Sequence, residues 1–89
     1  MGRFELRLAP SAERTLQRLP ESVAAAIVEF ATGPLLEEPF RVGRPLMREL
    51  AGYHVARRGH YRVIYRIDEA VVTVRVVRID HRADVYHPR

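Results

Sequence analysis

The stretch YRVIYRIDEAVVTVRVVRI, residues 61–79, decides the fold of this chain. Its first half alternates strictly, with Tyr61, Val63, Tyr65 and Ile67 on one side and Arg62, Ile64 and Arg66 on the other. This period of two is typical of a β-strand with one buried face. Residues 68–70 predict a tight turn, and the β-branched run at residues 71–79 predicts a long second strand. The stretch therefore predicts an antiparallel hairpin.

Two shorter runs with the same period precede this hairpin. Residues 45–50 predict one strand, and residues 53–57 predict another, with turns at Ala51-Gly52 and near Gly59. Because the four runs are separated by short turns, we expect them to pair in chain order as a four-stranded antiparallel meander.

The N-terminal forty residues carry a different pattern. Residues 4–8 alternate as a strand, and Pro10 opens a helix with an apolar stripe. Pro20 separates it from a second helix at residues 21–31, which ends before Gly33-Pro34. The predicted order is thus strand, two-helix hairpin and meander, an α+β fold with both helices on one sheet face and the other face open. The apolar stripe of the first helix consists of Ala12, Leu16 and Leu19, and that of the second helix consists of Val23, Ile27 and Phe30.

Size and composition narrow the classes of protein. With 89 residues, the chain predicts a single domain spanning residues 1–89. It has no cysteine, which excludes disulfides and thiolate zinc sites. No apolar run has the length of a membrane span, and the N-terminus lacks the pattern of a signal peptide, so we expect a cytoplasmic protein without a membrane partner.

The charge is concentrated in one half of the chain. Residues 1–40 hold four Arg and six Glu, a net charge of −2, whereas residues 41–89 hold eleven Arg and five acids, a net charge of +6. All fifteen basic residues are arginine, whose planar fork binds phosphate oxygens bidentately. A GC-rich genome accounts for the missing lysine, but the uneven distribution favours a nucleic-acid partner.

Several of these arginines interrupt the predicted strands. Taken one at a time, each is best interpreted as part of the solvated side of a sheet. Together with interleaved histidines they predict a positive, partly concave surface that carries titratable groups. The arginines are Arg57, Arg58, Arg62, Arg66, Arg75 and Arg78, and the histidines are His54, His60 and His81.

The C-terminal segment adds side chains that can transfer protons. They are His81 and Tyr86: a histidine side chain can pass protons near neutral pH, and a tyrosine hydroxyl can do so only if nearby positive charge lowers its pKa. RNA cleavage needs a base for the 2′-OH, an acid for the leaving oxygen and cations on the phosphate. Each residue also has a purely structural interpretation: His81 as a surface histidine hydrogen-bonded to a neighbouring aspartate, and Tyr86 as a side chain packed on the sheet edge. A metal site has weaker support, because the four histidines are scattered.

The residues just described resemble the RelE/ParE toxin superfamily, and the RelE-like branch in particular. The resemblance covers nearly the whole chain and is carried by Ala12-x-Arg14-x-Leu16-x-x-Leu19-Pro20, Pro45-Leu46, Gly52-Tyr53, Arg57 to Tyr65, His81-Arg82 and Val85-Tyr86. It implies the toxin of a type II toxin–antitoxin system, with an antitoxin partner. It also implies a nuclease that enters the ribosome and cuts mRNA by 2′-OH attack without a metal or other cofactor.

The resemblance also implies roles for individual residues. Arg62 matches the arginine that stabilises the transition state, Tyr86 a tyrosine base, and His81 lies near the histidine of other members. The residues that match RNA-binding positions are Arg48, His54, Arg57, Arg58 and Arg82. The sequence departs from the family where His54 and Ala56 replace lysines, and where Arg44 stands near the glutamate base of one branch. The base therefore remains open between Tyr86, His81 and His54.

Two other functions remain open at this point. One is a ParE-like inhibitor of DNA gyrase that performs no chemistry, which has no need of a proton-transfer pair such as His81 and Tyr86. The other is a non-catalytic module that occupies the ribosome or represses its own operon with its partner.

Overall fold

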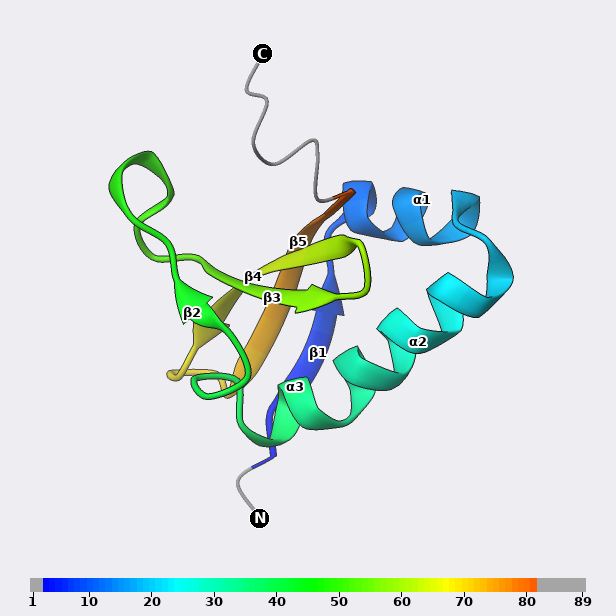
Figure 1. Cartoon of the computed structure of the whole chain (residues 1–89). Coiled ribbons are helices and arrows are strands. Elements are labelled where there is room, and N and C mark those ends of the chain that lie inside the picture. Colours follow the sequence, from blue (N-terminus) through cyan, green and yellow to red (C-terminus); the bar gives the residue numbers. More distant parts are fainter. Residues whose placement is uncertain (1–2, 82–89) are drawn as a thin grey trace.

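The computed structural model of the chain describes residues 3–81. These residues form a twisted sheet with helices on one side (Figure 1). The elements are β1 (Glu5–Leu8), α1 (Pro10–Arg18), α2 (Glu21–Thr32), α3 (Pro34–Glu37), β2 (Arg44–Pro45), a 3-10 turn η1 (Arg48–Leu50), β3 (His54–Arg58), β4 (Tyr61–Asp68) and β5 (Thr73–His81).

The sheet confirms the predicted meander. Its five strands have the order β1-β5-β4-β3-β2, so β2 to β5 lie side by side in chain order. These four pair antiparallel, whereas β1 joins the far edge and runs parallel to β5. The N-terminal strand and the last strand are thus neighbours.

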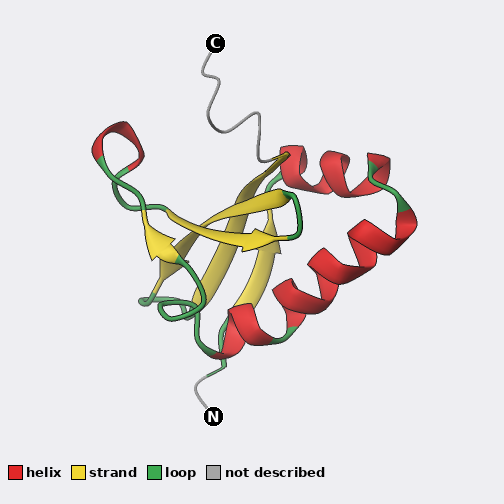
Figure 2. Ribbon diagram, in the orientation of Figure 1, coloured by secondary structure: helices red, strands yellow, loops and turns green. Residues whose placement is uncertain are grey.

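The helices cover one face of the sheet, as predicted (Figure 2). Ile27 and Phe30 of α2 pack in the same buried cluster as Val63, Val74 and Val76 of the sheet. No helix within residues 3–81 has the length and apolar character needed to cross a bilayer. The stability of the fold comes from this covered face, because burial of apolar side chains is the main favourable term in folding.

Tyr65 anchors the segment that follows the helices to this core. Its side chain is fully buried, and its hydroxyl donates a hydrogen bond to the Pro39 carbonyl at 2.8 Å. Burial raises the pKa of Tyr65 to about 12, so the hydroxyl remains a donor at any physiological pH. Gly43 crosses directly over this group: a Cβ there would overlap the Tyr65 hydroxyl and lie 2.6 Å from the Val55 carbonyl oxygen.

A β-bulge interrupts the regular alternation of side chains along β5. Ile64 pairs with Arg78 and Tyr65 pairs with Val76, so Val77 is an extra residue on β5. The hydroxyl of Ser11 in α1 donates to the Val77 carbonyl at 2.9 Å. Because of this extra residue, two residues of β5 that are three positions apart across the bulge, such as Arg75 and Arg78, point to the same face of the sheet.

The predicted strand at residues 45–50 is wrong beyond its start. The ladder continues only to Leu46, whose N–H donates to the Tyr53 carbonyl at 2.8 Å. The chain then closes on itself through η1, and Met47 is 76% exposed. No layer of the described structure covers this projecting loop, so its apolar residues have no face against which a strand could be buried.

Two smaller differences concern helices and turns. The sequence predicted only that the second helix ends at Gly33-Pro34; the structure adds the one-turn helix α3, in which Leu35 and Leu36 are buried. The turn between β4 and β5 spans residues 69–72 rather than 68–70, and Val72 adopts a positive φ of 49°. Val71 and Val72 belong to this exposed turn, because the sheet ends there.

Candidate functional site

The open face of the sheet carries arginines in cross-strand rows. Arg57 of β3 lies directly opposite Arg62 of β4, which in turn lies opposite Asp80 of β5. Directly opposite residues in an antiparallel sheet point to the same side. Ala56 and Val63, one position away, belong to the helix-covered core, so Arg57 and Arg62 point to the open side.

Two further rows follow along the same face. The second joins Arg44 of β2, Val55, Ile64 and Arg78, and the third joins Arg66, Arg75 and Arg7. Ile64 is buried, although the helices lie on the other face. The stems of surrounding arginines and the side chains of the projecting loop can shield it from water, since long basic side chains cover apolar surface with their methylenes.

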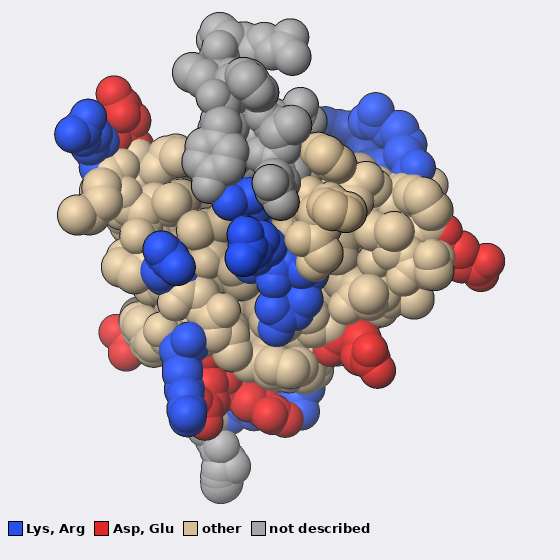
Figure 3. All heavy atoms as spheres, viewed as in Figure 1, with Lys and Arg blue, Asp and Glu red and all other residues tan. Residues whose placement is uncertain are grey.

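The charge on this face is only partly compensated. Arg78 forms an ion pair with Asp80, with 2.6 Å between Nη2 and Oδ2. Figure 3 shows basic side chains gathered over β3 and β4, with acidic side chains towards the rim. An anion that approaches this surface therefore meets a concentrated positive potential.

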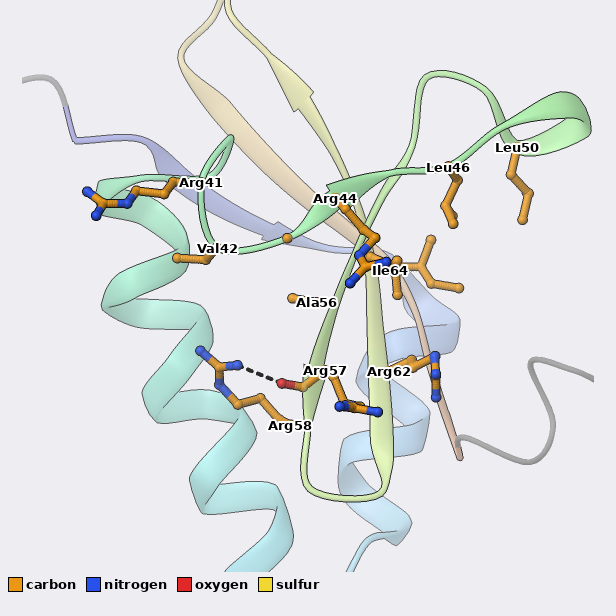
Figure 4. A pocket seen from close by; sticks show the side chains of 12 residues that line it. Arg41, Val42, Arg44, Leu46, Leu50, Ala56, Arg57, Arg58, Arg62 and Ile64 are labelled. Carbon is orange, nitrogen blue, oxygen red and sulfur yellow. Dashed lines mark hydrogen bonds between the residues drawn. The ribbon is translucent and has the colours of Figure 1, made fainter.

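Arg57, Arg62 and Arg44 line a shallow cavity of about 740 Å³ around the edge of β3. Figure 4 shows their side chains on one side of the strand, with Leu46 and Leu50 of the projecting loop above them. Arg41 and Arg58 line the other end of the cavity, on the side of α2. The cavity thus combines guanidinium groups with an apolar wall, a composition that suits a phosphate attached to a flat base.

His54 is not part of this arginine group. It lies opposite Tyr65, and its ring stacks on that of Tyr65 with the centroids 5.5 Å apart, while Phe40 meets it edge-on at 5.9 Å. Its Nδ1 has no hydrogen-bond partner within residues 3–81. Burial lowers the pKa of His54, which favours the neutral form of the ring.

Arg58 and His81 also belong to the helix-covered side. The Arg58 guanidinium lies 3.7 Å from the centre of the Phe30 ring of α2, and Nη1 donates to the Arg57 carbonyl at 2.6 Å. His81 lies opposite Tyr61, with the ring centroids 5.2 Å apart. The expected interleaving of histidines with the strand arginines is therefore absent from the described strands, while the proposed roles of these residues stay predictions.

The remaining predicted residues lie away from the cavity or outside the described part. Arg48 is exposed in η1, with a positive φ of 60°, and does not line the cavity. Arg82 and Tyr86 lie outside residues 3–81. The sequence reasoning missed Arg44 as a member of the group, although its pairing with Val55 places it there. The signal was its position one residue before the predicted strand at residues 45–50.

This arrangement can bind phosphate groups and stabilise charge that develops on them. Guanidinium groups remain protonated and donate several N–H bonds to phosphate oxygens. Within residues 3–81, no three His, Asp or Glu side chains are grouped so that they could share a metal ion.

Comparison with solved structures defines the class of protein. Residues of this chain superimpose on a chain of the toxin–antitoxin complex RelBE2 from Mycobacterium tuberculosis with a TM-score of 0.86 and 52% identity, covering 90% of this chain and 99% of that one. A YoeB/ParE toxin from Agrobacterium tumefaciens has a TM-score of 0.75 at 20% identity, over 88% of this chain and 98% of that one. The fold is thus that of the small α+β toxins of the RelE and ParE type.

The sequence comparisons agree with this class. The family model for the ParE toxin of type II toxin–antitoxin systems, parDE, matches residues 6–86. Toxin RelG of M. tuberculosis is 54% identical over 83 residues, which cover 93% of this chain and 95% of the relative. Toxin RelE of the same organism is 48% identical over 83 residues, 93% of this chain and 86% of the relative. The chain belongs to the RelE/ParE toxin superfamily, RelE-like branch, and is a toxin of a type II toxin–antitoxin system.

Proposed function

We propose that this toxin is a ribosome-dependent endonuclease that cuts mRNA and thereby inhibits translation. The observation that carries the proposal is the group of Arg44, Arg57 and Arg62 on the open-face side of one cavity at the edge of β3. Three guanidinium groups at one place match the charge that accumulates on a phosphate during strand cleavage. The relatives named RelG and RelE support the choice of this branch.

The chemistry requires no group beyond the RNA and protein side chains. The ribose 2′-oxygen loses its proton and attacks the adjacent phosphorus, and the bond from phosphorus to the 5′-oxygen breaks as that oxygen gains a proton. Arg62 stabilises the pentavalent phosphate, and Arg57 holds its non-bridging oxygens. Tyr86 or His81 serves as the base. Because His81 contacts Tyr61 on the helix-covered side, we assign the base to Tyr86 first.

The proposal includes two kinds of partner. The RelBE2 relative was solved as a toxin–antitoxin complex, and we infer that this chain is likewise neutralised by a cognate antitoxin. The positive face attracts ribosomal RNA and mRNA electrostatically, and an antitoxin segment with acidic residues would compete for it. Both partners imply action in the cytoplasm, where ribosomes translate.

The test is a reconstituted translation system with primer extension on the translated mRNA. Wild-type toxin is expected to produce discrete cleavage products, and Arg62→Ala to remove them. Arg18→Ala, an exposed arginine in α1, is the matched control and should cleave normally. Tyr86→Phe and His81→Ala then separate the two candidate bases. Intact transcripts at every toxin concentration would refute nuclease activity.

The matching family model supports one alternative to the nuclease, a function without catalysis. A ParE-like toxin that inhibits DNA gyrase would act without proton transfer, and the family model that matches is the ParE toxin of parDE. A supercoiling assay with the same protein preparations distinguishes the two functions. Inhibited supercoiling with unaffected translation would reverse the assignment.

A further inference from the structure

The arginines of the open face extend well beyond the cavity just described. Arg66, Arg75 and Arg7 lie directly opposite one another across β4, β5 and β1. They line a second hollow of about 710 Å³, and all three side chains are exposed. None of them forms an ion pair within residues 3–81. We refer to these three residues as the distal row.

The distal row is costly for the sheet and therefore needs an explanation. Like charges directly opposite each other on a sheet are destabilising. Of the three, Arg66 has an aromatic neighbour, because its guanidinium lies 5.4 Å from the centre of the Tyr53 ring. A partner that neutralises three guanidinium groups at once offsets that cost.

The bulge at Val77 makes the face continuous between the two ends. Arg75 and Arg78 are three residues apart, so regular alternation would place them on opposite faces of β5. The extra residue moves Arg78 to the same face as Arg75. Arg78, which is paired with Asp80 at 2.6 Å, then lies between the cavity and the distal row.

The spacing of the rows fits a nucleic-acid backbone. Arg62 and Arg66 are four residues apart on β4, a separation of about 13 Å at ~3.3–3.4 Å per residue. A stacked strand advances ~3.4 Å per nucleotide, so this separation corresponds to about four nucleotides, and to fewer when the strand is stretched.

The acidic residues mark where such a strand must end. Glu5 and Asp68 both lie opposite Thr73, one row beyond the distal row, and Glu69 follows in the turn. Carboxylates repel phosphate, so a polyanion can reach Arg66 and Arg75 but is not favoured further along the sheet. The hollow is thus positive towards the cavity and negative towards the turn.

We propose that the distal row is a phosphate-binding subsite for the same RNA strand, which runs along β4 from the cavity at Arg62 to Arg66, Arg75 and Arg7. This subsite holds phosphates a few nucleotides from the cleaved one and takes no part in the chemistry. The inference rests on the proposed function for the identity of the cleaved strand, but binding at the row is measured without cleavage.

The experiment measures binding of the 89-residue chain to 2′-O-methyl oligonucleotides, which lack the attacking hydroxyl. Strands of three and nine nucleotides are titrated at several salt concentrations, by fluorescence anisotropy and by the Nε–Hε resonances of the arginines. The double variant Arg66→Gln/Arg75→Gln tests the row. Arg14→Gln/Arg18→Gln, on exposed positions of α1, is the control with the same change in charge.

The expected result is a loss of about tenfold in affinity for the nine-nucleotide strand. The dependence of log K on log salt should weaken by about 1.4, at ~0.7 for each lost phosphate contact of a single strand. The three-nucleotide strand, bound at the cavity, and the control variant should change little. Thermal stability should stay the same or rise, because a like-charge pair is removed.

Three results would overturn the inference. One is unchanged affinity of the double variant for the long strand. The second is an equal loss for both strand lengths or for the control, which indicates a general charge effect. The third is a larger loss of affinity for a polyglutamate peptide, titrated in the same way, than for the nine-nucleotide strand, which assigns the row to an acidic protein partner. If the subsite is confirmed while transcripts remain intact in the translation assay, only the nuclease function fails.

Discussion

Replacing Gly43 by alanine tests whether the close crossing over Tyr65 holds this fold together. The added Cβ would overlap the Tyr65 hydroxyl and lie 2.6 Å from the Val55 carbonyl oxygen. Both neighbours are constrained, since Tyr65 is fully buried and Val55 pairs with β2 and β4. The alanine is accommodated only if Tyr65 or the backbone of β3 moves.

The magnitude follows from what such a movement breaks. Displacing Tyr65 leaves a buried hydroxyl without its bond to the Pro39 carbonyl, which costs about 1–3 kcal/mol. Overpacking of a filled core costs about 1–3 kcal/mol more. The expected loss of about 2–6 kcal/mol is a large part of the ~5–15 kcal/mol that stabilises a typical domain.

Urea denaturation of wild type, Gly43→Ala, Tyr65→Phe and the double variant forms the assay. Because Tyr65→Phe removes the oxygen nearest to the new Cβ, the double variant should lose less free energy of unfolding than the two single variants added together. The recovery is partial, since the Val55 carbonyl remains in place. A Gly43→Ala cost within about 0.5 kcal/mol of zero, or strict additivity in the cycle, would refute the reasoning.

Three further predictions concern the same equilibrium between the folded and the unfolded protein. Ser11→Ala leaves the bulge carbonyl of Val77 without its 2.9 Å bond; urea unfolding should show a loss of about 1 kcal/mol, and no loss would mean that water replaces the hydroxyl. Burial lowers the pKa of His54 in the folded protein, so the unfolded protein binds a proton at this residue more readily. The free energy of unfolding should therefore be full above pH 6.5 and fall as the pH drops through the folded pKa. In His54→Phe, the dependence of the free energy of unfolding on pH should be weaker. Arg58→Ala removes the guanidinium stacked on Phe30 and should cost about 0.5–2 kcal/mol, whereas Arg58→Met, which keeps most of the packing, should cost less.

Local patterns were enough to predict most of the fold. The alternation at Tyr61 to Ile67 and the apolar stripe of Ile27 and Phe30 each have one physical interpretation, and the structure confirms both. The failures lie where tertiary contacts decide. Residues 46–50 were predicted as part of a strand but project beyond the helical layer. The one-turn helix α3 exists because Leu35 and Leu36 find space in the core.

The site was predicted less completely, because the face of the sheet to which a side chain points depends on how neighbouring strands pair. Arg57 and Arg58 are consecutive in one strand, so one of them must point to the helices, and only the pairing with Arg62 and Tyr61 shows which. The bulge at Val77 is a stronger example. Nothing in the local sequence marks an extra residue there; the hydroxyl of Ser11, 66 positions away, satisfies its carbonyl.

The two faces of the sheet therefore divide stability and binding between them. Tyr65, Val63 and the helices build the core on one face, whereas the other face holds like charges that a fold selected for stability alone would not keep. Arginines of the open face can accordingly be removed without loss of the fold, and the same substitutions separate binding from folding. A Tyr65 or Gly43 variant does not separate binding from folding, because it destabilises the fold that carries the site. Reduced toxicity in such a variant therefore carries no information on the site.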